Sequence, residues 1–65
     1  MSPQFKSMKQ LRSMNLELFL AHFDEWSEYV VDRQGDVSQY ASAYFKQIGK
    51  LRQERINEKT DHTVA

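Results

Sequence analysis

The sequence predicts an all-α fold: an antiparallel helical hairpin with a short N-terminal helix, completed by dimerisation into a helical bundle. Three observations lead to this prediction. Apolar residues between positions 16 and 56 recur at helical spacing, Gly35 interrupts them at a short turn, and 65 residues is short for an independent core. We expect residues 1–57 to form a single helical domain and residues 58–65 a flexible C-terminal tail.

The N-terminal region is expected to form a short helix or an irregular lead-in. Ser2 followed by Pro3 suits a helix start, because serine caps free backbone N–H groups and proline needs no N–H at the first helical position. Four apolar residues then recur at every third position, a spacing that drifts around a helix: Phe5, Met8, Leu11 and Met14. A bend is expected at residues 13–15.

A long helix from about Leu16 to Arg33 gives the strongest signal. Asn15 is its expected N-cap, and Glu17 places an acid at the positive end of the helix. Its apolar residues follow the spacing of an amphipathic helix: Leu16, Phe19, Leu20, Phe23, Trp26 and Val30. Gly35 marks the natural stop, because a residue without Cβ enters the left-handed conformation with little strain.

A second long helix is expected from Val37 to Asn57. Asp36 at the N-cap and Gln39 three residues later form an approximate capping box. The inward face of this helix is marked by Val37, Ala41, Tyr44, Ile48, Leu51 and Arg55, flanked by Phe45 and Ile56. Because the connection is only two or three residues long, the two long helices are expected to be antiparallel.

The apolar surface of the first long helix is wider than one neighbouring helix can cover. At about 100° per residue, its apolar side chains span more than half of the circumference. A hairpin alone is expected to leave Leu18, Trp26 and Tyr29 exposed. We therefore expect a second apolar surface, which is a second copy related by a two-fold axis, the N-terminal segment folded back into a three-helix unit, or a larger host protein.

These patterns predict a small protein–protein interaction module, such as an adaptor, inhibitor or regulatory subunit, that occupies a surface without catalysis. The apolar contacts are assigned to Leu18, Phe19, Trp26 and Tyr29. An acidic stripe adds Asp24, Glu25, Glu28 and Asp32. Like charges on one face and acids near a helix C-terminus are mildly unfavourable, so the stripe indicates a basic partner, with plain solvation as the alternative.

DNA binding is the alternative function. The region from Val30 to Tyr44 resembles a helix-turn-helix motif, which implies a recognition helix that presents Ser38, Gln39, Ser42 and Lys46 to base edges. A basic arm of Lys6, Lys9 and Arg12 would then contact phosphates, or an anionic membrane surface. Against this, the net charge is zero, the preceding helix is acidic, and the apolar residue after the turn lies one place late.

The residue inventory argues against several other kinds of site. The sequence has no cysteine, which excludes disulfides and thiolate zinc sites. His22 and Glu25 share a helix face, but the second long helix offers no inward carboxylate, so we expect an ordinary exposed His22 and no metal or cofactor. No catalytic motif indicates an enzyme or a small-molecule substrate. No stretch suits a membrane span or a secretory signal, so a cytoplasmic protein is expected.

Overall fold

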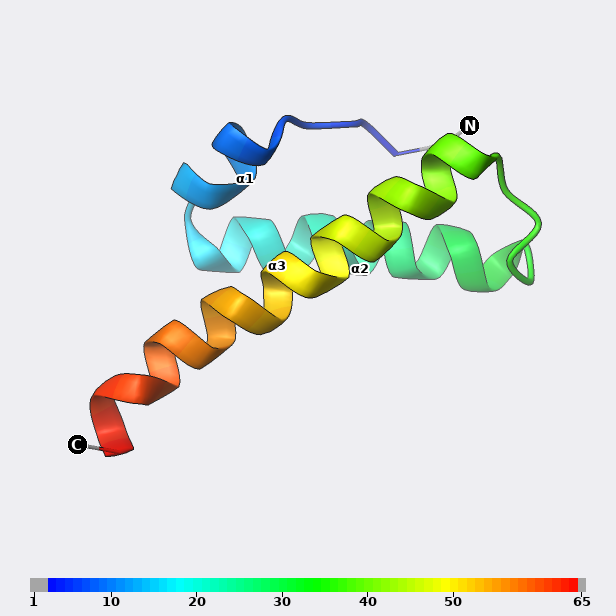
Figure 1. Cartoon of the computed structure of the whole chain (residues 1–65). Coiled ribbons are helices and arrows are strands. Elements are labelled where there is room, and N and C mark those ends of the chain that lie inside the picture. Colours follow the sequence, from blue (N-terminus) through cyan, green and yellow to red (C-terminus); the bar gives the residue numbers. More distant parts are fainter. Residues whose placement is uncertain (1–2, 65) are drawn as a thin grey trace.

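The computed structural model describes the backbone of residues 3–64 and the side chains of residues 3–58. It contains the helices α1 (Met8–Ser13), α2 (Leu16–Asp32) and α3 (Gln39–Val64), with no strand among the described residues. The long helices α2 and α3 pack as a hairpin, and the N-terminal segment with α1 runs along it (Figure 1). The predicted all-α hairpin with a short N-terminal helix is therefore confirmed.

The first helix begins later than the sequence predicts. Residues 3–7 are not helical, and α1 starts at Met8 after the N-cap residue Ser7. The Ser7 Oγ accepts a hydrogen bond from the backbone N–H of Gln10, while the Ser7 N–H donates to Gln10 Oε1, each at 3.2 Å. This reciprocal pair satisfies two free N–H groups at once. The predicted start at Ser2 and Pro3 is therefore wrong, because the capping box lies five residues further on.

The second helix begins at the predicted Leu16 and ends at Asp32, one residue before the predicted Arg33. Asn15 is its N-cap, and its Oδ1 accepts a hydrogen bond from the Glu17 N–H at 2.8 Å. The chain bends immediately before it, because Met14 has the extended φ and ψ of −78° and 157° and ends α1. The expected bend at residues 13–15 and the expected cap are both confirmed.

The turn after α2 uses two left-handed residues. Gln34 has a φ of 55° and Gly35 a φ of 81°. The Gly35 N–H donates to the Val30 carbonyl and the Gln34 N–H to the Val31 carbonyl, both at 2.9 Å. These two bonds define a Schellman motif, in which the left-handed residue directly after the helix cap is Gln34. The sequence identified Gly35 as the stop but not the strain at Gln34.

The third helix begins at Gln39 and not at the predicted Val37. The Ser38 Oγ accepts a hydrogen bond from the Ala41 N–H at 3.1 Å, so Ser38 takes the capping place predicted for Asp36. At its other end the helical backbone continues beyond Asn57 to Val64. The side chains after residue 58 and the whole of residue 65 lie outside the described residues, and the predicted flexibility of 58–65 stays a prediction.

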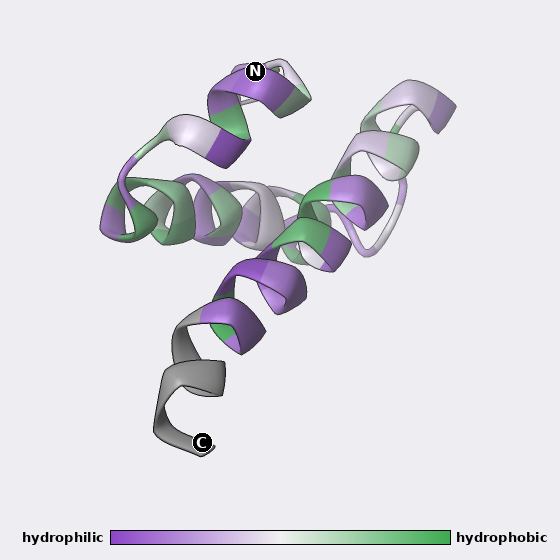
Figure 2. Cartoon of the chain, turned by 60° about the vertical axis from the view of Figure 1, so that its left-hand side comes forward, coloured by the Kyte–Doolittle hydropathy of each residue, from purple (hydrophilic) through white to green (hydrophobic). Residues whose placement is uncertain are grey.

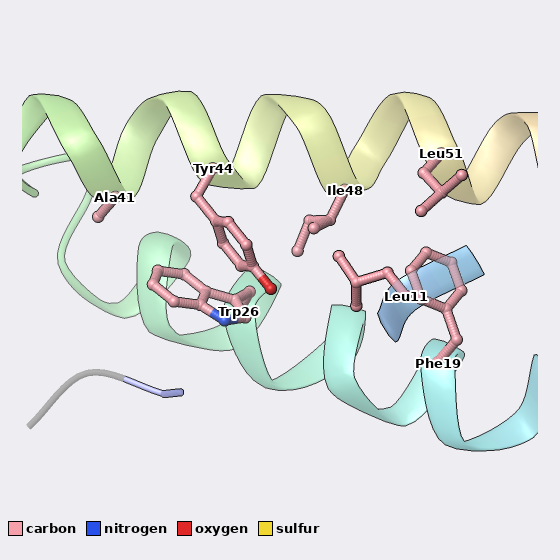
Figure 3. Packing of buried hydrophobic residues seen from close by; sticks show 7 residues of the cluster. All are labelled: Leu11, Phe19, Trp26, Ala41, Tyr44, Ile48 and Leu51. Carbon is pink, nitrogen blue, oxygen red and sulfur yellow. The ribbon is translucent and has the colours of Figure 1, made fainter. Parts of the chain in front are cut away.

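The core lies where all three helices meet (Figure 3). Its fully buried side chains are Leu11 from α1, Phe19 and Trp26 from α2, and Ile48 from α3, each with 0% of its surface exposed. The expectation that a single chain leaves Trp26 exposed is therefore wrong. Of the three covers considered, the N-terminal segment is the one that the structure contains, because it folds back over the hairpin into a three-helix unit.

We predict opposite effects for two glycine changes in the turn after α2. Gln34→Gly removes a Cβ from a left-handed residue, which relieves about 1–2 kcal/mol of strain, partly offset by the larger unfolded-state entropy of glycine. The free energy of unfolding should rise by about 0.5 kcal/mol. Gly35→Ala should lower it by about 1 kcal/mol through backbone strain alone, since a Cβ there meets no atom within 4 Å. Urea denaturation measures both, and a destabilised Gln34→Gly variant would contradict the Schellman assignment.

Candidate functional site

The extended residues 3–7 are fastened to both long helices through their backbone. Trp26 Nε1–H of α2 donates a hydrogen bond to the carbonyl oxygen of Gln4 at 3.0 Å. The Lys6 N–H donates to the Tyr44 Oη of α3 at 2.9 Å. Trp26 and Tyr44 are large aromatic residues whose polar atoms need partners once the rings are buried. The N-terminal segment supplies partners to both.

Phe5 anchors this segment on an aromatic cluster. The centroid of its ring lies 4.9 Å from that of Trp26, 4.7 Å from that of Tyr40 and 4.9 Å from that of Tyr44. The rings are tilted or edge-to-face, the geometries in which aromatic pairs attract each other. Sequence reasoning did not assign a role to Phe5. Its only sequence signal is that it stands at helical distance from Met8 although it precedes the first helix.

The other end of the N-terminal segment is held by α3. Arg55 Nη1 donates a hydrogen bond to the Leu11 carbonyl at 2.9 Å, which satisfies an oxygen that has no partner within the short α1. The Arg55 guanidinium also lies 5.3 Å from the ring centroid of Phe19. Arg12 and Glu54 add an exposed ion pair at 3.9 Å, which contributes little to stability. The cover over the hairpin is therefore fixed at both of its ends.

A buried polar pair lies beneath this cover. His22 is 6% exposed, and its Nε2 lies 2.9 Å from Tyr44 Oη. Burial first, and then the positive charge of Lys6, lowers the pKa of His22, while Glu25 acts weakly in the opposite direction. The imidazole is therefore neutral at pH 7. The Tyr44 oxygen accepts the Lys6 N–H and shares a second hydrogen bond with His22 Nε2. Burial likewise raises the pKa of Tyr44.

The solvent-exposed side of α2 is acidic, and its carboxylates form no ion pair with the described side chains. It carries five exposed carboxylates: Glu17, Asp24, Glu25, Glu28 and Asp32. None of them forms an ion pair with any cation among the described side chains. The predicted acidic stripe is thus accessible along its whole length. Figure 2 shows that hydrophobic and hydrophilic residues alternate along α2, so the acids border apolar rows of the same helix.

An open groove of about 470 Å³ borders this acidic face. It runs between the N-terminal segment and α2, and is lined by Gln4, Lys6, Met14, Leu18, Ala21, His22 and Glu25. Leu18 is 63% exposed at its edge, although it is a large apolar residue. The groove therefore combines apolar walls with one basic and one acidic residue. We call Leu18 and Ala21, together with the five carboxylates, the outer face of α2.

The structure divides the four apolar residues that were assigned to partner contact. Leu18 is exposed, as predicted. Tyr29 is half-buried, with its ring centroid 5.5 Å from that of Trp26 and the Arg33 guanidinium 4.7 Å above it. Phe19 and Trp26 are fully buried in the core of the single chain. The prediction that Phe19 and Trp26 lie on an exposed surface is therefore wrong, because the N-terminal segment and α3 already cover them.

Two of the residues assigned to DNA contact, Lys6 and Ser38, take part in internal hydrogen bonds. Lys9 and Arg12 are exposed on α1, whereas the Lys6 backbone is bonded to Tyr44 in the interior. On α3, Gln39 and Lys46 are exposed and Ser42 is half-buried, but the Ser38 hydroxyl is used as a helix cap. Six residues, 33–38, separate the long helices, which is longer than the turn of a helix-turn-helix motif. DNA contact by these residues stays a prediction.

Two further expectations concern His22 and the membrane. The expectation of an exposed His22 is wrong, since its ring is buried against Tyr44. Within the described residues, no group of three or more His, Cys, Asp or Glu side chains is placed to hold a metal ion. None of the described helices combines the length and apolar composition needed to cross a lipid bilayer.

Comparison with known proteins gives no relative: the chain matches no family model, no curated protein and no solved structure.

We predict that Phe5→Ala loosens the N-terminal cover. Truncation of a fully buried Phe costs about 3–5 kcal/mol, and because Phe5 is 42% exposed we expect a loss of about 2 kcal/mol. Trp26 is the single tryptophan, so its emission should shift to the red and acrylamide should quench it more. Val31→Ala removes apolar atoms from a side chain that is 70% exposed, and should change neither signal. An unchanged Trp26 spectrum in Phe5→Ala would refute the anchoring role.

The buried His22 should make stability pH-dependent. Its pKa is lowered in the folded chain, so between that value and the ordinary 6.5 the unfolded chain binds more protons. The stabilisation is present above about pH 6.5 and is lost as the pH falls below it. His22→Gln retains a side-chain acceptor and a side-chain donor for Tyr44 and cannot titrate. Urea denaturation at pH 7.5 and pH 5 should show a larger loss for the wild type than for His22→Gln, and equal losses would disprove the assignment.

Proposed function

We propose that this chain is a small, non-catalytic, cytoplasmic protein-binding module, and that the outer face of α2 occupies a cationic surface of another protein. One observation carries the proposal. Five exposed carboxylates share α2 with the exposed Leu18, and no cation among the described side chains pairs with them. A partner that brings both an apolar side chain and positive charges complements this face in shape and in charge.

The arrangement of the acids is unfavourable within the isolated chain. Asp24, Glu28 and Asp32 follow one another at intervals of four residues, and each such like-charge pair costs a few tenths of a kcal/mol. Asp32 also ends α2, where a negative charge opposes the helix dipole, and no basic residue lies in the last turn. Positive charges from a partner relieve both effects, whereas intramolecular contacts do not.

The groove beside Leu18 indicates the form of the partner. Leu18 and Ala21 form its apolar wall on α2, and Met14 continues this wall at the end of α1. A groove of about 470 Å³ accommodates one or two apolar side chains projecting from a neighbouring segment. An amphipathic helix with Lys or Arg beside its apolar row supplies such side chains at the spacing of one helical turn. We therefore assign a cationic amphipathic helix as the partner segment. Self-association is also part of the proposal.

A synthetic amphipathic helix of leucine and lysine tests this assignment. We expect its addition to shift the backbone amide resonances of residues 16–32, and the dissociation constant to rise with salt because exposed charges are screened. Glu25→Gln combined with Glu28→Gln should weaken binding about tenfold, which corresponds to about 1.4 kcal/mol. The control, Glu54→Gln combined with Glu58→Gln, removes the same charge from α3 and should have much less effect.

Three outcomes would contradict the proposal. They are the absence of binding, equal weakening by the α2 and α3 variants, and resonance shifts confined to α1 and α3. Equal weakening would show that the peptide responds to net charge alone. Shifts on α1 and α3 would show that a different surface is used.

A further inference from the structure

Both long helices carry a buried row of residues on the side that faces the N-terminal segment. Phe19, His22 and Trp26 form this row on α2, and Ala41, Tyr44, Ile48 and Leu51 form it on α3. No residue in these rows is more than 6% exposed. The N-terminal segment completes the burial, since it contacts Trp26, Tyr44 and Arg55. We call this side of the hairpin the covered seam.

A second pair of rows lies on the opposite side of the hairpin. On α2 the row is Leu16, Leu20, Phe23, Ser27 and Val30, and on α3 it is Ser42, Phe45, Gly49, Arg52 and Ile56. Their spacing alternates between three and four residues, which is the pattern of helices that pack in coiled coils and bundles. Every one of the ten is half-buried, although several are as apolar as the residues of the covered seam. We call this side the open seam.

Phe23 lies at the centre of the open seam. Its ring stacks on Phe45 with centroids 5.4 Å apart, and a Cβ added to Gly49 would lie 3.7 Å from its Cε1. The Arg52 guanidinium lies 5.2 Å from the Phe23 ring centroid. Arg52 Nε is buried and has no hydrogen-bond partner. A buried donor without an acceptor is unfavourable, so the occupant of this seam must bring an acceptor to it.

The two edges of the open seam carry opposite charges. On α2, Asp24 and Glu17 lie beside the row, each directly after one of its residues in the sequence. On α3, Lys46 lies beside the row in the same way. All three are exposed, and none forms an ion pair with a described side chain. In helical bundles the residues that flank an apolar seam set the choice and the orientation of the partner helix. This seam has one acidic edge and one basic edge, so it is complementary to itself.

We propose that a second copy of this chain packs on the open seam, with the two-fold axis parallel to the long helices. In this arrangement α2 packs against α3 of the partner, and Asp24 lies beside the partner's Lys46. Phe23 is level with Gly49, so Asp24 and Lys46 differ in level by two residues, or about 3 Å. A two-fold axis perpendicular to the helices would instead place Asp24 against the partner's Asp24, which is repulsive.

The second copy also supplies the missing acceptor. Glu17 lies seven residues, or about two helical turns, from Asp24 toward the start of α2, and it differs in level from Arg52 of α3 by three residues, or about 4.5 Å. The α2 of one copy therefore brings a carboxylate toward the partner's Arg52. The four long helices form a bundle, with an N-terminal segment covering each hairpin from outside. This interface does not use Leu18, Glu25 or Glu28 but shares Glu17 and Asp24 with the outer face, so the variants that test the two proposals are placed at different residues.

Sedimentation velocity over a concentration series tests the proposal. We expect the wild type to change from monomer to dimer with concentration. Asp24→Lys and Lys46→Asp should each weaken the dimer about tenfold or more, because the symmetric interface contains each pair twice. The double variant exchanges the two charges and should recover an affinity within about threefold of the wild type. Both residues are exposed, so the helical fold should persist, which circular dichroism checks.

Matched controls separate this interface from effects of net charge. Glu28→Lys and Lys50→Asp change the charge by the same amounts on outward faces, and should leave the dimer unchanged. Leu20→Asn should weaken the dimer, whereas Leu18→Asn on the outer face should not. A wild type that stays monomeric, a double variant that does not recover, or controls as damaging as the tests would overturn the proposal. Loss of dimerisation with retained binding of the Leu/Lys peptide would leave the outer-face proposal intact.

Discussion

The fold depends on the cover that residues 3–14 place over the hairpin. Without it, Trp26 and Tyr44 would each lose a hydrogen-bond partner and much of their burial, and both are central to the only seam that is fully closed. A chain of this length buries a small fraction of its surface, so an uncovered indole is a large loss. The short helix α1 is too short to be stable in isolation and owes its position to Leu11, Arg55 and the capping box.

The parts of the fold that depend on nearby residues could be predicted from the sequence. The bounds of α2 follow from its apolar spacing and from Asn15, whose side chain reaches only two residues along the chain. The starts of α1 and α3 were misplaced because two candidate caps competed in each case. Ser7 and Ser38 won over Ser2 and Asp36, and their hydroxyls bond N–H groups three residues ahead. Periodicity alone does not rank such neighbouring caps.

The burial of the candidate contact residues could not be predicted in the same way. Trp26 is bonded to a residue 22 positions earlier and Tyr44 to one 38 positions earlier, and no local pattern specifies such pairings. Arguments from helix geometry showed that α2 needs more than one neighbour, but not that residues 3–14 supply one of them. The outer face was easier to identify, since its acids recur along one side of a helix that the sequence already predicts.

The three sides of α2 are the physical basis of the proposed dimer. The covered seam and the contact with α3 use the residues around Phe19 and Trp26, while the outer face is charged. The row from Leu16 to Val30 lies between α3 and the outer face. Its residues are only half-buried, and all of them except Ser27 are apolar. The N-terminal segment cannot reach this row, because both of its ends are fastened on the opposite side. In the proposed dimer a second copy completes its burial, and the opposite charges along its two edges favour an identical chain.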